Sequence, residues 1–235
     1  MADLTHIVLS PQTYEEALEY WRNKVALTPK EFRKLNDEAK VNAFTIAGAT
    51  GLDMLLDVWR MVDRAIAQGT TLREFQEQAR AIFADKGWEG PAPYRLDNVF
   101  RTNIQTAYQV GRYRQQTSRE VLEATPNWMY SAVHDNRTRP SHMAMDGIVR
   151  RADDPFWNEW YPPNGYRCRC TVRNLSDDDV RARGLTVGAG IPDLTIRPDP
   201  GFAVNPGKQA WQPDLERYPP AFRAAYRKRL EGNGL

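Results

Sequence analysis

The feature that most constrains this chain is one stretch, residues 128–173, in which its reactive and its bulky side chains gather. Both cysteines, Cys168 and Cys170, and two of the three histidines, His134 and His142, lie there. The same stretch holds many rigid or bulky residues, namely Pro140, Pro155, Trp157, Trp160, Pro162 and Pro163. Proline fixes φ and buried aromatic rings supply large contact areas, so this stretch, here called the His–Cys region, is predicted to be rigid and irregular.

The two cysteines favour a metal site over a disulfide. One residue separates Cys168 from Cys170, so a disulfide between them would be strained. In an extended segment their thiols project to the same side, and thiolates and imidazoles are ligands that Zn²⁺ prefers. We expect His142 as the third zinc ligand and His134 as the fourth, with Asp146 as the alternative fourth ligand.

The spacing leaves other interpretations open. Structural zinc sites usually place two to four residues between paired cysteines, so two buried free thiols that pack as small apolar side chains also fit the sequence. A catalytic set is a further alternative, with Cys168 or Cys170 as nucleophile and His142 as base, or with Asp146 or Glu159 beside a metal. Nothing in the spacing brings these atoms within hydrogen-bond reach, and we predict that the chain is not an enzyme.

Local patterns predict strands and a short helix around this region. Residues 128–134 are rich enough in aromatic and β-branched side chains for a strand, and residues 167–173 alternate between two faces. Residues 135–147 read as a polar loop. Ser176 is a helix N-cap followed by three aspartates, which suit the positive end of the helix dipole, and Gly184 ends that helix.

Residues 1–120 carry the periodicity of helices. Apolar side chains recur at helical spacing in residues 14–25, 32–39, 52–66 and 72–82. Thr28 with Glu31 has the sequence of a capping box, and Thr71 with Glu74 opens a later helix. A final helix, residues 94–119, presents one polar face that is either solvated or packed on the His–Cys region. That face consists of Arg101, Gln105, Tyr108 and Arg112.

The charge balance favours a protein partner over DNA. The net charge is +2, from 32 basic and 30 acidic residues, whereas non-specific DNA binding needs a clustered basic excess. No apolar run approaches the roughly 18 residues that cross a bilayer, and residues 1–10 lack the pattern of a signal peptide. With only two cysteines, we expect synthesis in a reducing compartment and no membrane association.

Several pieces of the sequence, in order, resemble the phage Mu F-like head morphogenesis family, the minor head proteins encoded beside the portal in many tailed phages. The first pieces are Tyr94-Arg95-Leu96, Phe100-Arg101-Thr102-Asn103 and Ala107-Tyr108. The next are Asp135, Arg137-Thr138-Arg139-Pro140, His142, Asp146-Gly147, Asp154-Pro155-Phe156-Trp157, Tyr161-Pro162-Pro163-Asn164-Gly165 and Arg167-Cys168-Arg169-Cys170. The resemblance is good over residues 94–172, moderate over residues 199–207 and slight over the first ninety residues.

This resemblance implies a minor capsid protein, made in the host cytoplasm and built into the virion at the head interior or the portal vertex. The expected partners are the portal protein and the major capsid or scaffolding protein, during prohead formation and DNA packaging. Some relatives carry a further toxin or enzyme domain. Only about 60 residues follow Arg173, too few for another large domain, so we expect a structural member of the family.

Two alternative functions stay open at this point. A metal-dependent hydrolase acting on DNA or on head proteins would use the cysteine and histidine cluster. An internal virion protein in contact with packaged double-stranded DNA would use basic side chains. The candidates for that contact are Arg167, Arg169, Arg173, Arg223, Arg227, Lys228 and Arg229.

The patterns together predict an α+β fold in three parts. Residues 1–90 form a helical N-terminal region, and residues 91–190 combine the long helix with a small irregular β-region that carries the His–Cys region. Residues 191–235 form an extended proline-rich arm, with seven of the sixteen prolines between 191 and 220, and a short terminal helix over residues 221–230.

Overall fold

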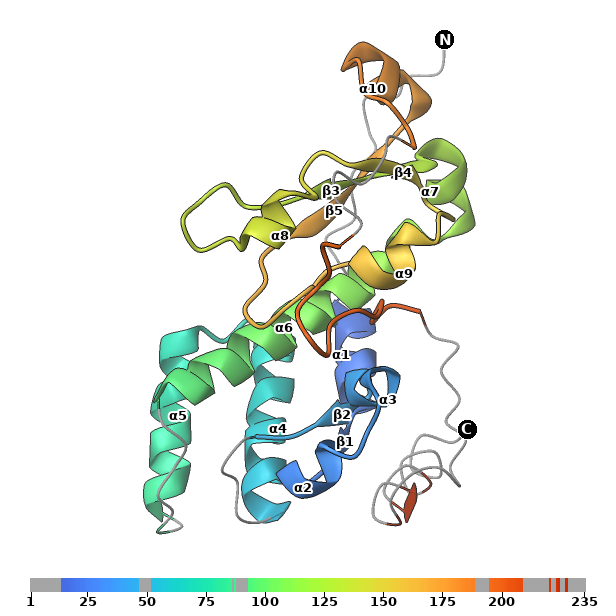
Figure 1. Ribbon diagram of the computed structural model, residues 1–235. Helices are drawn as coiled ribbons and strands as arrows, with labels where there is room; N and C mark the ends of the chain where they lie inside the picture. Colours follow the sequence, from blue (N-terminus) through green and yellow to red (C-terminus); the bar gives the residue numbers. More distant parts are fainter. Residues whose placement is uncertain are drawn as a thin grey trace.

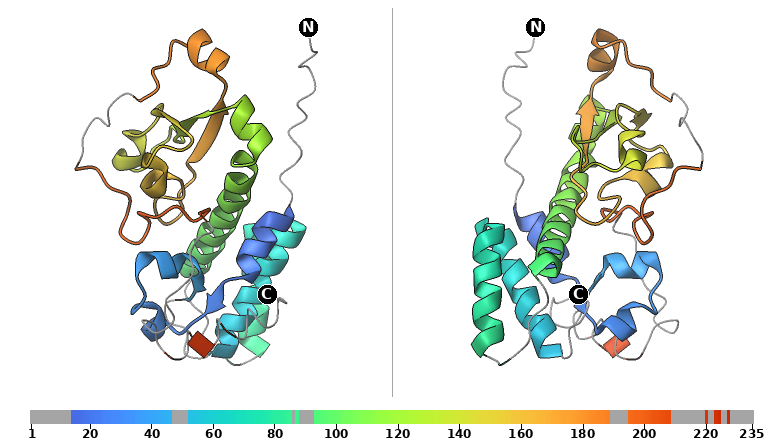
Figure 2. Two further views of the ribbon diagram at one scale, coloured as in Figure 1. Left: turned by 90° about the vertical axis from the view of Figure 1, so that its right-hand side faces the viewer. Right: turned by 60° about the vertical axis from the view of Figure 1, so that its left-hand side comes forward.

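A computed structural model describes residues 14–46, 52–85, 87, 93–188 and 195–208, together with residues 220, 223, 224 and 227. The fold is α+β, as predicted. One long helix, α6 (Pro93–Gln116), separates a group of helices from a small three-stranded sheet (Figure 1). The α6 helix contributes to both halves of the molecule along its length (Figure 2).

The helical part is built from α1 (Tyr14–Arg22), α4 (Leu52–Gln68), α5 (Leu72–Asp85) and the first half of α6. The apolar stripe expected in residues 52–66 faces the core of this part, where Leu55, Val58 and Val62 are fully buried. Trp21 of α1 stacks on Trp59 of α4 with ring centroids 5.7 Å apart. The helical periodicity of the sequence therefore identified the surface that these helices bury.

Between α1 and α4 the chain forms a small unit that the sequence did not predict. Two short strands, β1 (Val25–Ala26) and β2 (Ala43–Phe44), pair in parallel, and α2 (Pro29–Phe32) and α3 (Asp37–Val41) connect them. Val25, expected on the first helix, instead belongs to β1. The capping box of Thr28 and Glu31 is present. The helix it opens ends after one turn, because the Asn36 side chain accepts from the Ala39 amide and caps a second helix.

The sheet of the second half has the order β4-β3-β5 and is antiparallel. Its strands are β3 (Asn127–Ser131), β4 (Val149–Arg151) and β5 (Thr171–Leu175). Short helices complete this half, namely α7 (Arg119–Ala124), α8 (Pro140–Met143), α9 (Phe156–Trp160) and α10 (Asp177–Ala182). The expected N-cap Ser176 forms a capping box with Asp179.

Two boundaries in this half differ from the prediction. The strand expected over residues 167–173 begins at Thr171, so Cys168 and Cys170 lie in the turn before β5 and not on the strand. Arg167 has a φ of 60°, in the left-handed region, which breaks the extended alternation just ahead of the cysteines. The loop expected over residues 135–147 contains α8, because Pro140 starts a helical turn there.

The His–Cys region has its own core, in which both cysteines are buried beside aromatic rings. The large buried residues of this core are Trp128, Tyr130, Trp157, Trp160 and Tyr161. Neighbouring rings meet mostly edge to face, as for Trp128 and Trp157, whose centroids lie 5.6 Å apart. This region is therefore one packed unit, as its composition predicted.

The trailing segment, residues 195–208, lies over the His–Cys region and alongside α6. The Asn205 side chain donates to the Trp157 carbonyl at 2.9 Å, and the Asp199 amide donates to the Asn164 carbonyl at 2.9 Å. This agrees with the extended arm that the prolines predicted. The parts of the arm at 189–194 and 209–219, and most of the terminal helix expected over 221–230, lie outside the described residues.

Candidate metal centre

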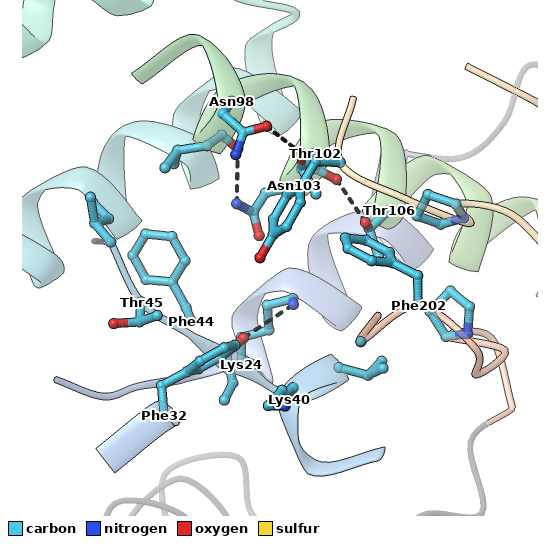
Figure 3. Close-up of a pocket in the computed structure, with 18 of the residues that line it drawn as sticks. Lys24, Phe32, Lys40, Phe44, Thr45, Asn98, Thr102, Asn103, Thr106 and Phe202 are labelled. Carbon is cyan, nitrogen blue, oxygen red and sulfur yellow. Dashed lines mark hydrogen bonds between the residues drawn. The ribbon is translucent and has the colours of Figure 1, made fainter. Parts of the chain in front are cut away.

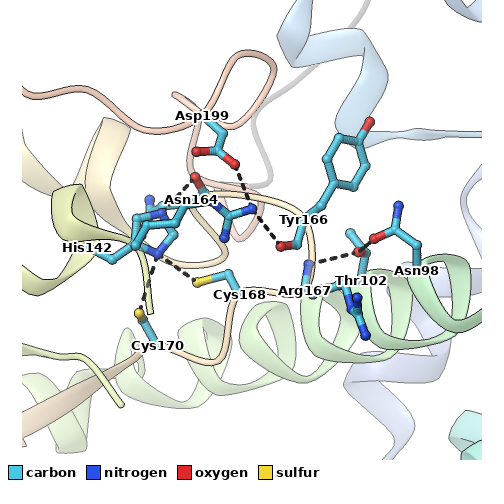
Figure 4. A network of polar contacts seen from close by, with 10 residues as sticks. Asn98, Thr102, His142, Asn164, Tyr166, Arg167, Cys168, Cys170 and Asp199 are labelled. Carbon is cyan, nitrogen blue, oxygen red and sulfur yellow. Dashed lines mark hydrogen bonds and ion pairs between the residues drawn. The ribbon is translucent and has the colours of Figure 1, made fainter. Parts of the chain in front are cut away.

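Three of the predicted ligands meet in the core of the His–Cys region. His142 lies on α8 and is 1% exposed, while Cys168 and Cys170 lie in the turn before β5 and are 4% and 2% exposed. The His142 Nδ1 atom is 3.6 Å from the Sγ of Cys168 and 3.6 Å from the Sγ of Cys170. All three potential ligand atoms lie within 4.8 Å of one another (Figure 4).

The hydrogen bond of His142 Nε2 fixes the direction in which the Nδ1 lone pair points. Nε2 lies 3.2 Å from the Asn164 backbone carbonyl, which can only accept a hydrogen bond, so Nε2 carries the proton. This leaves the lone pair of Nδ1 directed at both sulfur atoms. Histidines that bind metals are commonly oriented in this way, through a hydrogen bond from the nitrogen that does not bind the ion.

The distances fit a tetrahedral zinc site. With Zn–S bonds of about 2.3 Å and Zn–N bonds of about 2.0–2.1 Å, a sulfur and a nitrogen ligand lie about 3.6 Å apart. Both nitrogen–sulfur distances around His142 have this value. Two of the three distances within the group therefore have the length that a tetrahedral zinc site requires.

The two thiols influence each other's acidity. The hydrogen bond from Cys168 lowers the pKa of Cys170, and His142 and Tyr130 act in the same direction. The same thiol pairing, together with burial, raises the pKa of Cys168. Because the thiolate is the form of cysteine that binds metals, the pair has one sulfur ready to coordinate.

The other two predicted ligands lie elsewhere. His134 is on an exposed loop, with 68% of its side chain accessible, and its Nε2 is 2.6 Å from Asp146 Oδ2. The other carboxylate oxygen of Asp146 accepts from the Ala132 amide at 2.7 Å. The structure thus pairs His134 with Asp146 and brings neither of them into the group formed by His142, Cys168 and Cys170.

Sequence reasoning missed the polar side chains that surround the sulfur atoms. Tyr130 donates to the Asn164 side chain at 2.9 Å, and Asn164 in turn donates to the Glu159 carbonyl at 3.2 Å. Tyr130 and Asn164 are both fully buried. The only sequence signal for these roles is that both residues fall inside the His–Cys region.

Helix α6 holds the segment that carries the cysteines. Gln109 donates to the Cys170 carbonyl at 3.2 Å, and Arg112 donates to the Val172 carbonyl at 3.1 Å. Gln116 also donates to Val172, at 3.1 Å, and accepts from the Tyr161 hydroxyl at 2.7 Å. Of the polar face predicted on this helix, Arg112 therefore packs on the His–Cys region, and the two glutamines were not anticipated.

A family model for "Phage Mu protein F like protein" matches residues 57–173, from within α4 to β5. The matched segment contains His142, Cys168, Cys170 and all of α6. Over these residues the chain belongs to the family of Phage Mu F-like proteins.

Two curated relatives extend this similarity. The chain is 40% identical over 172 residues to the Mu-like prophage FluMu F protein of Haemophilus influenzae, a match that covers 68% of this chain and 41% of the relative. It is 32% identical over 246 residues to the putative capsid assembly protein F of Escherichia phage Mu, covering 85% of this chain and 55% of the relative. The chain thus spans about half the length of these relatives. No solved structure matches it.

None of the helices that the structure describes combines the length and the apolar character that a membrane span requires.

Proposed function

We propose that this chain acts in the head assembly of a tailed phage, as a minor head protein that binds portal or capsid subunits. The proposal is supported chiefly by the family match over residues 57–173, together with the similarity to a relative named as a putative capsid assembly protein. The packing adds to this support, because the His–Cys region is a rigid surface held on a long helix. Rigid surfaces suit assembly because they lose little freedom on binding.

The exposed loop between β3 and α8 is the part of this surface that we expect to contact a partner. Both carboxylate oxygens of Asp135 accept from Arg169, each at 2.7 Å, so the loop is tied to the cysteine turn. This bidentate pair fixes the loop geometry. Arg137 is exposed at the tip of the loop and available to an acidic partner surface.

Co-sedimentation with proheads tests this proposal. Proheads assembled from the portal and capsid proteins of the same phage are sedimented with the purified chain, with Arg137→Glu and, as a matched charge reversal on α5, with Arg73→Glu. We expect the wild type and Arg73→Glu to sediment with the heads and Arg137→Glu to lose at least tenfold in binding. A wild-type chain that stays in the supernatant would contradict the assembly role.

Ion pairs between arginines and aspartates of this chain favour a protein partner over DNA. Arg167 forms an ion pair with Asp97, and Arg169 forms its pair with Asp135. A basic side chain that is already neutralised contributes little to phosphate binding. The carboxylate suggested for hydrolysis, Glu159, lies 3.5 Å from Arg197 and is not part of the cysteine and histidine cluster.

We also propose that His142, Cys168 and Cys170 hold a Zn²⁺ ion. The ion would join α8 to the turn before β5, and so stabilise an irregular region that has few regular backbone ladders. Because the three side chains are buried, the fourth ligand is then a water molecule.

Elemental analysis checks the zinc proposal. We expect about one zinc per chain in the wild type and in His134→Asn, and loss of zinc in His142→Asn and Cys168→Ser. Replacement by Co²⁺ should give thiolate-to-cobalt absorption in the wild type, and a chelator should lower its unfolding midpoint. A wild-type chain without metal, or zinc loss in His134→Asn, would speak against this ligand set.

A further inference from the structure

A second polar site lies about the start of α6, away from the sulfur cluster. It is a cavity of about 780 Å³ between α6, the β1–β2 unit and the trailing segment. Figure 3 shows Lys24 and Phe32 on one side of it and Asn98, Thr102 and Asn103 of α6 on the other. The volume lies in the range of cavities that bind small molecules or short peptides.

Lys24 is the unusual residue of this cavity. It is 7% exposed, and its Nζ donates to the Ala43 carbonyl at 3.3 Å and lies 5.2 Å from the centre of the Tyr20 ring. An ammonium group has three donors, and no carboxylate among the described residues pairs with this one. A buried charge without an opposite charge is costly, and such groups are found where a ligand supplies the missing charge.

The other charged side chains that line the cavity have more partners than Lys24 or are more exposed to solvent. Lys40 pairs with Asp37 at 3.0 Å, Arg167 pairs with Asp97, and Arg95 donates to the Tyr94 hydroxyl. Arg33, the remaining cation of the lining, is exposed. One buried positive charge is therefore left without a counter-charge.

The rim of the cavity carries the exposed aromatic surface of the molecule. Among the described residues, the two large apolar side chains that are exposed are Tyr94, at 64%, and Tyr166, at 52%, and both line this cavity. The Tyr166 ring meets Phe202 of the trailing segment edge to face at 4.9 Å. Exposed aromatic rings beside a cavity are typical of surfaces that bind another polypeptide.

We infer that this cavity binds an acidic peptide segment of a partner protein, with one carboxylate paired to Lys24 and adjacent apolar side chains against the aromatic rim. A single buried ammonium balances the single charge of a carboxylate, whereas a phosphate dianion would keep half of its charge uncompensated. The hydroxyl of Thr45, which also lines the cavity, is buried without a hydrogen-bond partner.

The protonation of Lys24 gives the site a recognisable signature. Burial lowers the pKa of Lys24 to about 7. A carboxylate binds the ammonium form, so its affinity should fall as the pH rises above about 7. The other charged or titratable groups that face the cavity are Tyr20, Arg33, Asp37, Lys40, Tyr94, Arg95, Tyr166 and Arg167. Lys40→Met, which removes the second lysine of the lining, is the control for their contribution.

A pair of peptides that differ in one charge tests the inference. The full chain, labelled with ¹³C at the lysine Cε, is titrated at pH 6.5 and pH 8.5 with acetyl-Phe-Glu-Phe-amide and with acetyl-Phe-Gln-Phe-amide. We expect the glutamate peptide to shift the Lys24 signal saturably and to bind at least tenfold more tightly than the glutamine peptide at pH 6.5. This preference should shrink at pH 8.5, vanish in Lys24→Met and persist in Lys40→Met, with the affinities of both variants measured by isothermal titration calorimetry because Lys24→Met lacks the Lys24 signal.

Three results would overturn the inference. They are equal binding of the two peptides, a preference that survives in Lys24→Met, and tighter binding of adenosine monophosphate than of the glutamate peptide, which would indicate a phosphate site. Unfolding midpoints of both variants, measured in the same buffer, separate loss of the site from loss of the fold.

Discussion

Lys24 and His142 are both almost fully buried, but their polar atoms differ in how many hydrogen-bond partners they have. Both ring nitrogens of His142 have partners, one in the Asn164 carbonyl and the other in the two sulfur atoms. The ammonium group of Lys24 donates one hydrogen bond, to the Ala43 carbonyl, and otherwise lies over the face of the Tyr20 ring. Because a buried cation with unsatisfied donors opposes folding, Lys24 should destabilise the chain when no ligand is bound.

Lys24→Met should therefore stabilise the free protein. Burial lowers the pKa of Lys24 from 10.5 to about 7 in the folded state, so between these values only the unfolded wild type keeps the proton and wild-type stability rises with pH. We expect the variant to be more stable by roughly 2–4 kcal/mol at pH 7. The difference should narrow towards pH 10, as followed by urea unfolding at both pH values. A less stable Lys24→Met at pH 7 would contradict this account of the lysine.

At the candidate site, the sequence predicted the positions of some residues and not of others. The types and clustering of Cys168, Cys170 and His142 indicated a common site, and the structure brings them together. A periodic pattern could not predict the positions of His134 and Asp146. The loop before α8 carries His134 outward, and Asp146 turns towards it. Lys24 gave no signal, since a lysine at the end of an amphipathic helix is normally solvated.

At the scale of helices and strands, caps were predictable and strand pairing was not. The capping boxes at Thr28 and Thr71 follow from local hydrogen bonds between residues three apart, which a sequence displays directly. The parallel pair β1–β2 joins residues 18 positions apart through strands of two residues each, too short for any alternation to show. The early start predicted for β5 failed for a local reason, the left-handed backbone of Arg167.

The trailing segment is involved in two close approaches at glycine residues, and the one at Gly207 requires glycine because it meets the base of the Tyr113 side chain. A Cβ at Gly207 would lie 2.4 Å from Tyr113 Cγ, and a Cβ at Gly165 would lie 2.4 Å from Asp199 Oδ2. The Tyr113 ring is itself held edge to face against Tyr161, with centroids 5.0 Å apart, so it has little room to move.

Gly207→Ala should detach this segment locally. We expect a loss of about 1–3 kcal/mol from overpacking, and faster proteolysis within residues 195–208. Gly111→Ala, in the interior of α6, is the matched control, because its new methyl group would meet Ala17 and Glu16 at ordinary contact distances of 3.5 Å and more. The control should be neutral or slightly stabilising. Equal proteolysis rates for Gly207→Ala and the wild type would show that the segment does not rely on this approach.

At the scale of the whole molecule, α6 is the element that both cores share. Its residues Leu96, Ala107 and Val110 belong to the core of the helical part, and its residues Gln109 and Gln116 hold the turn before β5 and the strand itself. The two cores are thus joined by buried hydrogen bonds as well as by a continuous backbone.

Gln116→Ala should weaken this connection. The substitution removes one of the two donors to the Val172 carbonyl, which keeps its bond from Arg112. It also removes the shorter of the two hydrogen bonds of the buried Tyr161 hydroxyl, and we expect a loss of about 1–3 kcal/mol. Gln105→Ala, on the same helix, removes a half-buried glutamine for which the structure records no side-chain hydrogen bond, and should change stability by less than about 1 kcal/mol. Thermal unfolding of both variants makes the comparison, and similar losses in the two would refute the role given to Gln116.

The position of the trailing segment also determines when the cavity around Lys24 is completed. Phe202 and its neighbours form one wall of that cavity, yet they follow both cores in the chain. Proteins are synthesised from the N-terminus, so a nascent chain can fold both cores while this wall is still inside the ribosome. The site that accepts the acidic peptide therefore closes last, after the frame that surrounds it has formed.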